Sequence, residues 1–207
     1  MITLYTMLST SPNIRKITLM LAETRLPYTV HIFEKQLDGK LPDEFLAINP
    51  NGTVPAILDK DNGAVIFESC AILYYLAEKS GRLLPVEIKA RGEVMKWLIF
   101  EAANMGATMG ELYYYLLQAT DELADTDLQR YKDKITQFCL ILDRQLEGRD
   151  YLCGEYSIAD IALYPWYGVL EDMADVSLHE YQHLKKWAVT IDQRPTGIAS
   201  VYSGNRI

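Results

Sequence analysis

The chain has 207 residues, a formal net charge of −8 and a pI near 4.9. Its 49% hydrophobic and 23% charged residues are typical of a folded globular protein with a sizeable core. The acidic balance argues against nucleic acid or an anionic membrane as a partner, because both are bound through clustered Lys and Arg. No apolar run approaches the roughly 18 residues of a membrane span and no signal-peptide pattern opens the chain, so we expect a cytoplasmic protein.

The first part of the chain has the pattern of a βαβ unit. A short β-type run at Ile2–Tyr5 is followed by the breaker Ser11-Pro12-Asn13 and then by a helical apolar pattern that extends to Leu26. The next run, Tyr28–Phe33, is rich in β-branched and aromatic residues. We therefore expect two parallel strands joined by a right-handed helical crossover.

The chain continues with a hairpin between two helices. The turn Asp61-Asn62-Gly63 is typical of a hairpin, and Gly81 is a helix stop signal. The expected elements are a short helix at 43–48, antiparallel strands at 54–58 and 64–67, and a helix from Ser69 to Gly81.

The composition changes after Leu84-Pro85. No convincing strand pattern follows Ile88, and apolar residues recur at helical spacing in four stretches, at 91–117, 128–146, 158–173 and 181–193. We therefore predict two domains, at 1–82 and 88–207, joined by a linker at 83–87.

The cysteines and histidines do not form a disulfide or metal pattern. Cys70, Cys139 and Cys153 are odd in number and widely spaced, which favours a reducing compartment, and Cys70 fits a small buried residue. His179 and His183 have the i,i+4 spacing of a shared metal site, but they lack a third ligand nearby and are interpreted as surface residues. We predict no metal.

Three motifs on these elements carry a resemblance to a known family. They are Asn51-Gly52-Thr53-Val54-Pro55, Phe67-Glu68-Ser69 at a helix start, and Tyr156-Ser157-Ile158-Ala159-Asp160 in the helical part. Together with the order of elements, they resemble the cytosolic glutathione transferases. The resemblance implies an α+β fold, in which an N-terminal thioredoxin-like βαβ-ββα domain precedes an all-α helical domain.

Two further segments are most similar to the bacterial nu class of this family. They are the residues at 11–16, SPNIRK, and those at 45–50, FLAINP. The resemblance implies a homodimeric enzyme that uses the glutathione thiolate on disulfide, peroxide or electrophilic substrates, with disulfide reductase activity. The alternative from another class is a glutathione-binding regulatory protein without turnover, which fold alone does not exclude.

Glu68 and Ser69 suit the γ-glutamyl arm of glutathione. Ser69 begins a helix, where unpaired backbone N–H groups and the helix dipole favour the carboxylate, and Glu68 can pair with the ammonium. The simpler interpretation is that Glu68-Ser69 only caps the helix.

Three other positions complete the glutathione site that the resemblance implies. Thr53, Val54 and Pro55 enter a strand, and a cis peptide before Pro55 leaves the backbone of Val54 free to pair with the cysteinyl amide. Lys40 is placed to meet the glycine carboxylate. Pro55 can also be a plain strand-entry proline, and Lys40 an ordinary solubilising residue.

The reacting sulfur needs a donor that favours the thiolate. Asn13 and the hydroxyls of Ser11 and Thr10 lie between the first strand and the first helix, and Ser9 is close enough to leave the hydroxyl assignment open. The same residues fit a capped helix start without a ligand. Tyr5 is a weaker candidate because it lies within the strand.

In the helical part, Ser157 and Asp160 have the spacing of a capping box, so we assign Asp160 to folding. The acceptor pocket is expected along the first long helix, where side chains at helical spacing can equally be core; its candidates are Met105, Met109, Tyr113 and Tyr114. The resemblance also implies that Glu101 and Arg130 reach glutathione, although Gln is more usual in place of Glu101, and Arg130 fits a surface charge equally well.

Overall fold

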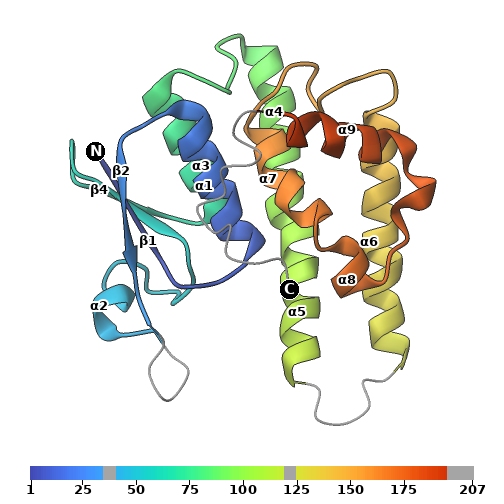
Figure 1. Ribbon diagram of the computed structural model, residues 1–207, viewed down its shortest axis with the longest axis horizontal. Coiled ribbons are helices and arrows are strands. Elements are labelled where there is room, and N and C mark those ends of the chain that lie inside the picture. Colours follow the sequence, from blue (N-terminus) through green and yellow to red (C-terminus); the bar gives the residue numbers. More distant parts are fainter. Residues whose placement is uncertain (35–40, 119–124, 195–207) are drawn as a thin grey trace. The chain divides into compact units, whose positions relative to one another are not determined.

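The computed structural model describes residues 1–34, 41–118 and 125–194, and in this part the chain forms two compact units, Met1–Leu84 and Pro85–Arg194 (Figure 1). Lys40, the predicted partner of the glycine carboxylate, lies outside the described residues. No helix in the described ranges is long and apolar enough to cross a membrane.

A mixed four-stranded sheet forms the centre of the first unit. Its order is β2-β1-β3-β4, with β1 parallel to β2 and antiparallel to β3, and β3 antiparallel to β4. This arrangement confirms the predicted parallel βαβ unit and the predicted hairpin. The strands are β1 (Ile2–Thr6), β2 (Tyr28–Ile32), β3 (Ala56–Asp59) and β4 (Ala64–Phe67).

Three helices complete this unit: α1 (Pro12–Thr24), α2 (Asp43–Leu46) and α3 (Ser69–Ser80). Helices α1 and α3 pack against each other beside the sheet (Figure 1), and each contributes buried apolar side chains. Helix α3 ends where the sequence predicted, because Gly81 takes the left-handed conformation (φ 66°) and its N–H bonds to the last-turn carbonyls. The side chains of the core are buried completely or nearly so; among them are Ile2, Leu4, Ile14, Ile17, Ile57, Ile72 and Leu73.

The second unit is helical. In its described residues, Cys153 and Glu155 form an isolated antiparallel β-bridge. Its elements are α4 (Ile88–Phe100), the π-helix η1 (Glu101–Met105), α5 (Gly106–Gln118), α6 (Asp125–Gln145), α7 (Ile158–Tyr167), α8 (Leu170–Ala174), the 3₁₀ helix η2 (Leu178–Glu180) and α9 (Gln182–Asp192).

Two predicted helices of this unit differ from the structure. The helical stretch predicted at 91–117 starts earlier, because the Glu87 carboxylate caps α4 by accepting from the N–H groups of Lys89 and Ala90. The same stretch is interrupted by the π-helix η1. The stretch at 158–173 is two helices. Pro165 lies inside α7 and has no N–H to donate to the carbonyl one turn earlier, and the helix ends soon after it at Tyr167.

The predicted capping box of α7 is confirmed, and it extends further than a cap. The Oδ2 atom of Asp160 accepts from the N–H of Ser157 at 3.0 Å, and Oδ1 accepts from the N–H of Leu152 and from Nε1 of Trp187, both at 2.9 Å. Asp160 is completely buried. Its carboxylate therefore ties α7 to the preceding loop and to α9.

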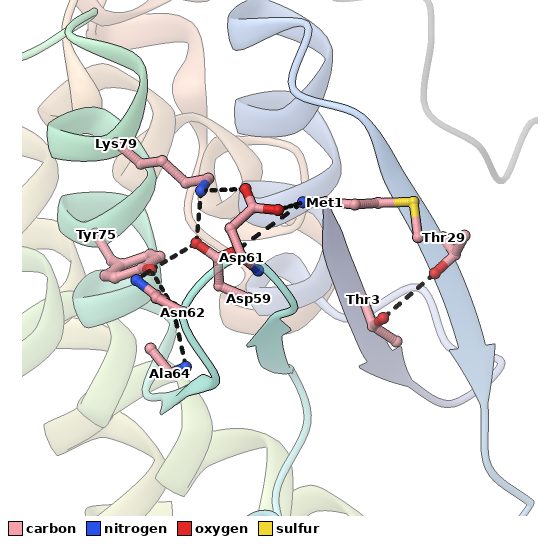
Figure 2. A network of polar contacts seen from close by, with 9 residues as sticks. All are labelled: Met1, Thr3, Thr29, Asp59, Asp61, Asn62, Ala64, Tyr75 and Lys79. Carbon is pink, nitrogen blue, oxygen red and sulfur yellow. Dashed lines mark hydrogen bonds and ion pairs between the residues drawn. The ribbon is translucent and has the colours of Figure 1, made fainter.

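A charged network joins the N-terminal residue, the end of β3 with the turn after it, and α3 in the first unit (Figure 2). The Lys79 ammonium lies 2.7 Å from Oδ2 of Asp59 and 2.7 Å from Oδ2 of Asp61, and the Met1 ammonium lies 2.6 Å from Oδ1 of Asp61. The Tyr75 hydroxyl donates to Oδ2 of Asp59 at 2.6 Å. Burial of Asp59 opposes its ionisation, but the hydrogen bonds that it accepts from Lys79, Tyr75 and the N–H of Asp61 hold its pKa at about 2.

This network predicts an acid-sensitive contribution to stability. Because the pKa of Asp59 is lower in the folded protein than its ordinary value of 3.8, its contribution is complete above about pH 4 and is lost as the pH falls toward about 2. Asp59→Asn should lower the free energy of unfolding by about 2 kcal/mol at neutral pH. Urea unfolding of both proteins at about pH 7 and pH 2.5 measures this. The prediction is contradicted if the free energies of unfolding of the two proteins differ by the same amount at both pH values. The control is Asp150→Asn at an exposed position, which should cost less than about 0.5 kcal/mol.

Asp160→Ala should destabilise the protein by about 3 kcal/mol, because it leaves buried donors of Ser157, Leu152 and Trp187 without an acceptor. Denaturant unfolding followed by tryptophan fluorescence measures the loss. Asp133→Ala, on the exposed face of α6, is the matched control and should cost less than about 0.5 kcal/mol. A loss below about 1 kcal/mol for Asp160→Ala would show that the buried carboxylate is dispensable.

Candidate functional site

The N-terminus of α3 has no side-chain cap. Glu68 is the N-cap residue, but its exposed side chain makes no capping hydrogen bond, and its backbone has a φ of 69° and a ψ of 115°. A positive φ in a non-glycine residue costs on the order of 1–3 kcal/mol and is found most often at functional sites. Ser69 follows as the first helical residue. This helix start is therefore suited to an anion, which the uncapped N–H groups and the helix dipole would favour.

Three polar side chains meet between the N-terminal turns of α1 and α3. The Lys16 ammonium donates to Oδ1 of Asn13 at 2.8 Å and to the Ser69 hydroxyl at 3.3 Å. The Ser69 hydroxyl in turn donates to Oδ1 of Asn13 at 3.2 Å. The predicted residues Asn13 and Ser69, which are far apart in the sequence, are thus in direct contact.

These contacts fix the orientation of the Asn13 amide. An ammonium group has only donors, so the Asn13 atom that faces Lys16 must be the carbonyl oxygen. The amide nitrogen is then on the other branch, and it makes no hydrogen bond with any described residue. Asn13 thus keeps two N–H donors for a ligand.

The loop before α1 holds the hydroxyl candidates. The Ser9 hydroxyl accepts from the backbone N–H of Ser11 at 3.1 Å, which shapes the turn. Ser11 is the N-cap residue of α1, but its side chain makes no capping bond, and Thr10 is exposed. The hydroxyls of Thr10 and Ser11 are therefore without partners in the described part of the chain. The choice between them stays open.

The entry to β3 has the expected cis peptide between Val54 and Pro55. Asn49 shapes this entry, because its completely buried amide donates to the Thr53 carbonyl at 2.6 Å and accepts from the N–H of Asn51 at 3.0 Å. Val54 pairs with neither strand, and its backbone N–H and C=O make no hydrogen bond with the described residues. These two groups are available to an extended ligand.

Sequence reasoning did not identify Lys16 and Asn49 as site residues. Lys16 is 1% exposed, which is rare for a lysine. The available signal was its register, because it precedes the buried Met20 by four residues and so lies on the buried face of α1. Asn49 had a weaker signal, as a turn residue before Pro50.

The candidates of the second unit lie in two environments. Met105 and Met109 are 1% and 0% exposed and pack in its core, whereas Tyr113 and Tyr114 are 54% and 63% exposed. Arg130 is also exposed, and its guanidinium lies 3.5 Å from Asp127. The acceptor pocket and the contact of Arg130 with glutathione stay predictions.

Glu101 lies in the π-helix η1 and is 1% exposed. It accepts a hydrogen bond from Nε1 of Trp166 at 2.6 Å. A Cβ at Gly106 would lie 2.5 Å from Oε1 of Glu101, so glycine leaves the space that the carboxylate needs. This position gives Glu101 a structural environment, and its contact with glutathione stays a prediction.

The remaining candidates lie outside this arrangement. Tyr5 packs beside Phe33, with ring centroids 6.0 Å apart, and Cys70 is buried in α3. His179 lies in η2 and His183 in α9, where its Nδ1 is 3.3 Å from Oδ2 of Asp143, so the two histidines do not share one helix. Within the described ranges, no three His, Cys, Asp or Glu residues form a group that could hold a metal.

The sequence matches two family profiles. Residues 10–79 match the N-terminal domain of glutathione S-transferase, and residues 108–195 match its C-terminal domain. The chain is 35% identical to the disulfide-bond oxidoreductase YfcG of Escherichia coli (strain K12) over 191 residues, 89% of this chain and 88% of that protein. It is 32% identical to the disulfide-bond oxidoreductase YghU of the same organism over 203 residues, 89% of this chain and 69% of that protein.

Solved structures have the same fold. A glutathione transferase family member from Pseudomonas fluorescens Pf-5, with two glutathione bound, has a TM-score of 0.85 and 35% identity over 94% of this chain and 89% of that chain. A glutathione transferase from Pseudomonas putida, with one glutathione disulfide bound per subunit, has a TM-score of 0.84 and 32% identity over 94% and 88% of the two chains. The predicted α+β fold and the predicted family are confirmed. The chain belongs to the glutathione S-transferase family.

Proposed function

We propose that this protein is a glutathione-dependent enzyme that reduces disulfides, with glutathione bound along the first unit. The observation that carries the proposal is the meeting of two helix N-termini at Asn13 and Ser69, beside a strand entry with an unpaired backbone. These groups match a ligand that has a carboxylate, an extended peptide backbone and a sulfur.

The γ-glutamyl arm is assigned to the start of α3. Its carboxylate would accept hydrogen bonds from the uncapped N–H groups and from the hydroxyl of Ser69, and the exposed Glu68 would pair with its ammonium. The strained backbone of Glu68 holds its side chain at this helix start. The arrangement therefore provides opposite charges for both groups of the arm.

The cysteinyl part is assigned to the strand entry. The free N–H and C=O of Val54 can pair with the peptide amide of glutathione as an added strand does, with Pro55 fixing the turn and Thr53 beside it. Lys40 is retained as the proposed partner of the glycine carboxylate.

The sulfur is assigned to the start of α1. The free N–H donors of Asn13, with a hydroxyl of Ser11 or Thr10, would stabilise the thiolate over the thiol. Lowering the thiol pKa from about 8.5 to about 6.5 requires a differential interaction of about 2.7 kcal/mol. One or two well-oriented donors and the helix dipole can supply that energy.

Glutathione itself supplies the redox chemistry. The three cysteines of this chain are Cys70, Cys139 and Cys153, so none lies in the loop before α1. Burial raises the pKa of Cys139 to about 12 and that of Cys153 to about 11, which disfavours either as a nucleophile. Two glutathione molecules then provide the two electrons, so that one disulfide becomes two thiols and one glutathione disulfide is formed.

The names of the relatives support this chemistry. YfcG and YghU are disulfide-bond oxidoreductases, and the solved structures from two Pseudomonas species hold glutathione or its disulfide. The homodimer, the cytoplasmic location, the roles of Glu101 and Arg130 and the apolar acceptor site remain parts of the proposal.

The enzyme should bind glutathione and reduce 2-hydroxyethyl disulfide with it. Asn13→Ala should lower kcat/KM for this reaction about 100-fold, because the thiolate loses its amide donors. Titration calorimetry with glutathione and a coupled disulfide reductase assay measure binding and turnover.

The matched control is Asn62→Ala, an exposed asparagine in the β3–β4 turn of the same unit, which should keep kcat/KM within about twofold. Glutathione binding without turnover on disulfide, peroxide or aryl halide substrates would contradict the proposed enzyme and favour the regulatory binding protein. Equal activity of Asn13→Ala and the native protein would reject the assignment of the sulfur to α1.

A further inference from the structure

We propose that Lys16 is a positioning residue for the thiolate, acting through the amide of Asn13. This inference rests on the proposed function, because it concerns the donor that faces the sulfur. Lys16 itself is not assigned a contact with glutathione.

The first observation is the burial of Lys16. A lysine loses favourable hydration when its ammonium enters the interior, and such residues are almost always held by specific partners. Here the ammonium is placed within hydrogen-bond distance of Asn13 and Ser69, the two residues assigned to opposite ends of the γ-glutamylcysteine part.

The second observation is its location at the start of α3. The N-terminus of a helix is the positive end of its dipole, where a cation is disfavoured and an anion is favoured. The Lys16 ammonium nevertheless donates to the hydroxyl of Ser69, the first residue of α3. This contact links the amide of Asn13 to the helix start to which the γ-glutamyl carboxylate is assigned.

The third observation is the geometry at Asn13. Lys16 lies three residues after Asn13 on α1, so the two side chains share one face of the helix. An asparagine amide can rotate by half a turn and exchange its oxygen and nitrogen. The rotated amide would direct an N–H group at the Lys16 ammonium, which has only donors, so the orientation in which Oδ1 faces Lys16 is favoured.

The consequence concerns the sulfur. A fixed amide presents its N–H donors to the thiolate, and no further conformational entropy is lost to orient it when glutathione binds. Without Lys16, both orientations of the Asn13 amide would be populated, and fewer molecules would have an N–H facing the sulfur. The thiol pKa of bound glutathione would therefore rise.

A double-mutant cycle tests the inference. The variants are Lys16→Met, Asn13→Ala and the combination of both, and the pKa of bound glutathione is followed through the ultraviolet absorbance of the thiolate as a function of pH. Each single variant should raise this pKa by about 1. At any pH below the pKa, the fraction of bound glutathione that is ionised then falls about tenfold. The double variant should raise it no further than Asn13→Ala alone, because Lys16 acts through Asn13.

Lys60→Met is the matched control, since Lys60 is exposed in the same unit, and it should leave the pKa of the bound thiol unchanged. The inference is overturned if Lys16→Met binds and ionises glutathione as the native protein does, or if its effect adds fully to that of Asn13→Ala. It is equally overturned if Asn13→Ala has no effect while Lys16→Met has one.

Two further outcomes are distinguishable. If the native protein does not bind glutathione, the proposed function fails, and this inference falls with it. If Lys16→Met does not fold, the cycle is repeated with Lys16→Leu, whose side chain has no hydrogen-bond donor, and the same criteria apply.

Discussion

The hydrogen-bonded contact between the first turns of α1 and α3 is the interaction on which the candidate site depends. Lys16, Asn13 and Ser69 hold two helix N-termini together, although the positive ends of their dipoles repel each other. The energy that opposes this repulsion comes from the apolar contacts of the same helices, among them Ile17 and Ile72, which are completely buried. The core of the first unit therefore keeps two helix N-termini side by side, an arrangement that an anion would favour.

The opposite end of α3 is held by a different kind of interaction. Tyr75 and Lys79, in the last turns of the helix, bond to the buried Asp59 at the end of β3 (Figure 2). The helix is thus fixed to the sheet by ionic hydrogen bonds at its C-terminal end, where a cation suits the dipole. Its N-terminal end is left without a cap. The ion pairs of Lys79 with Asp59 and Asp61 thus stabilise the end of α3 that is opposite the candidate site.

The elements that sequence reasoning predicted correctly are those with strong local signals. The hairpin around Asp61-Asn62-Gly63, the glycine stop of α3 and the capping box of Asp160 each depend on residues close together in the chain. The π-helix at Glu101 depends on tertiary packing, and periodicity alone does not contain that information. The end of α7 had a local signal in Pro165, but the apolar periodicity at 158–173 continues across it. Lys16 was missed for a related reason. A lysine in a helix is ordinarily exposed, and one of the groups that accept from its ammonium here, the Ser69 hydroxyl, is distant in the sequence.

Asn13 shows why residue type predicted part of the site and orientation required the structure. Its amide was a candidate because a neutral donor can stabilise a thiolate, but sequence cannot say which branch of the amide faces the ligand. An ammonium placed directly on the sulfur could also return a proton to it, whereas an amide N–H does not titrate in the relevant range. In the proposed site, Lys16 therefore acts on the sulfur only through the neutral amide of Asn13, and this amide has no titratable proton to return to the thiolate.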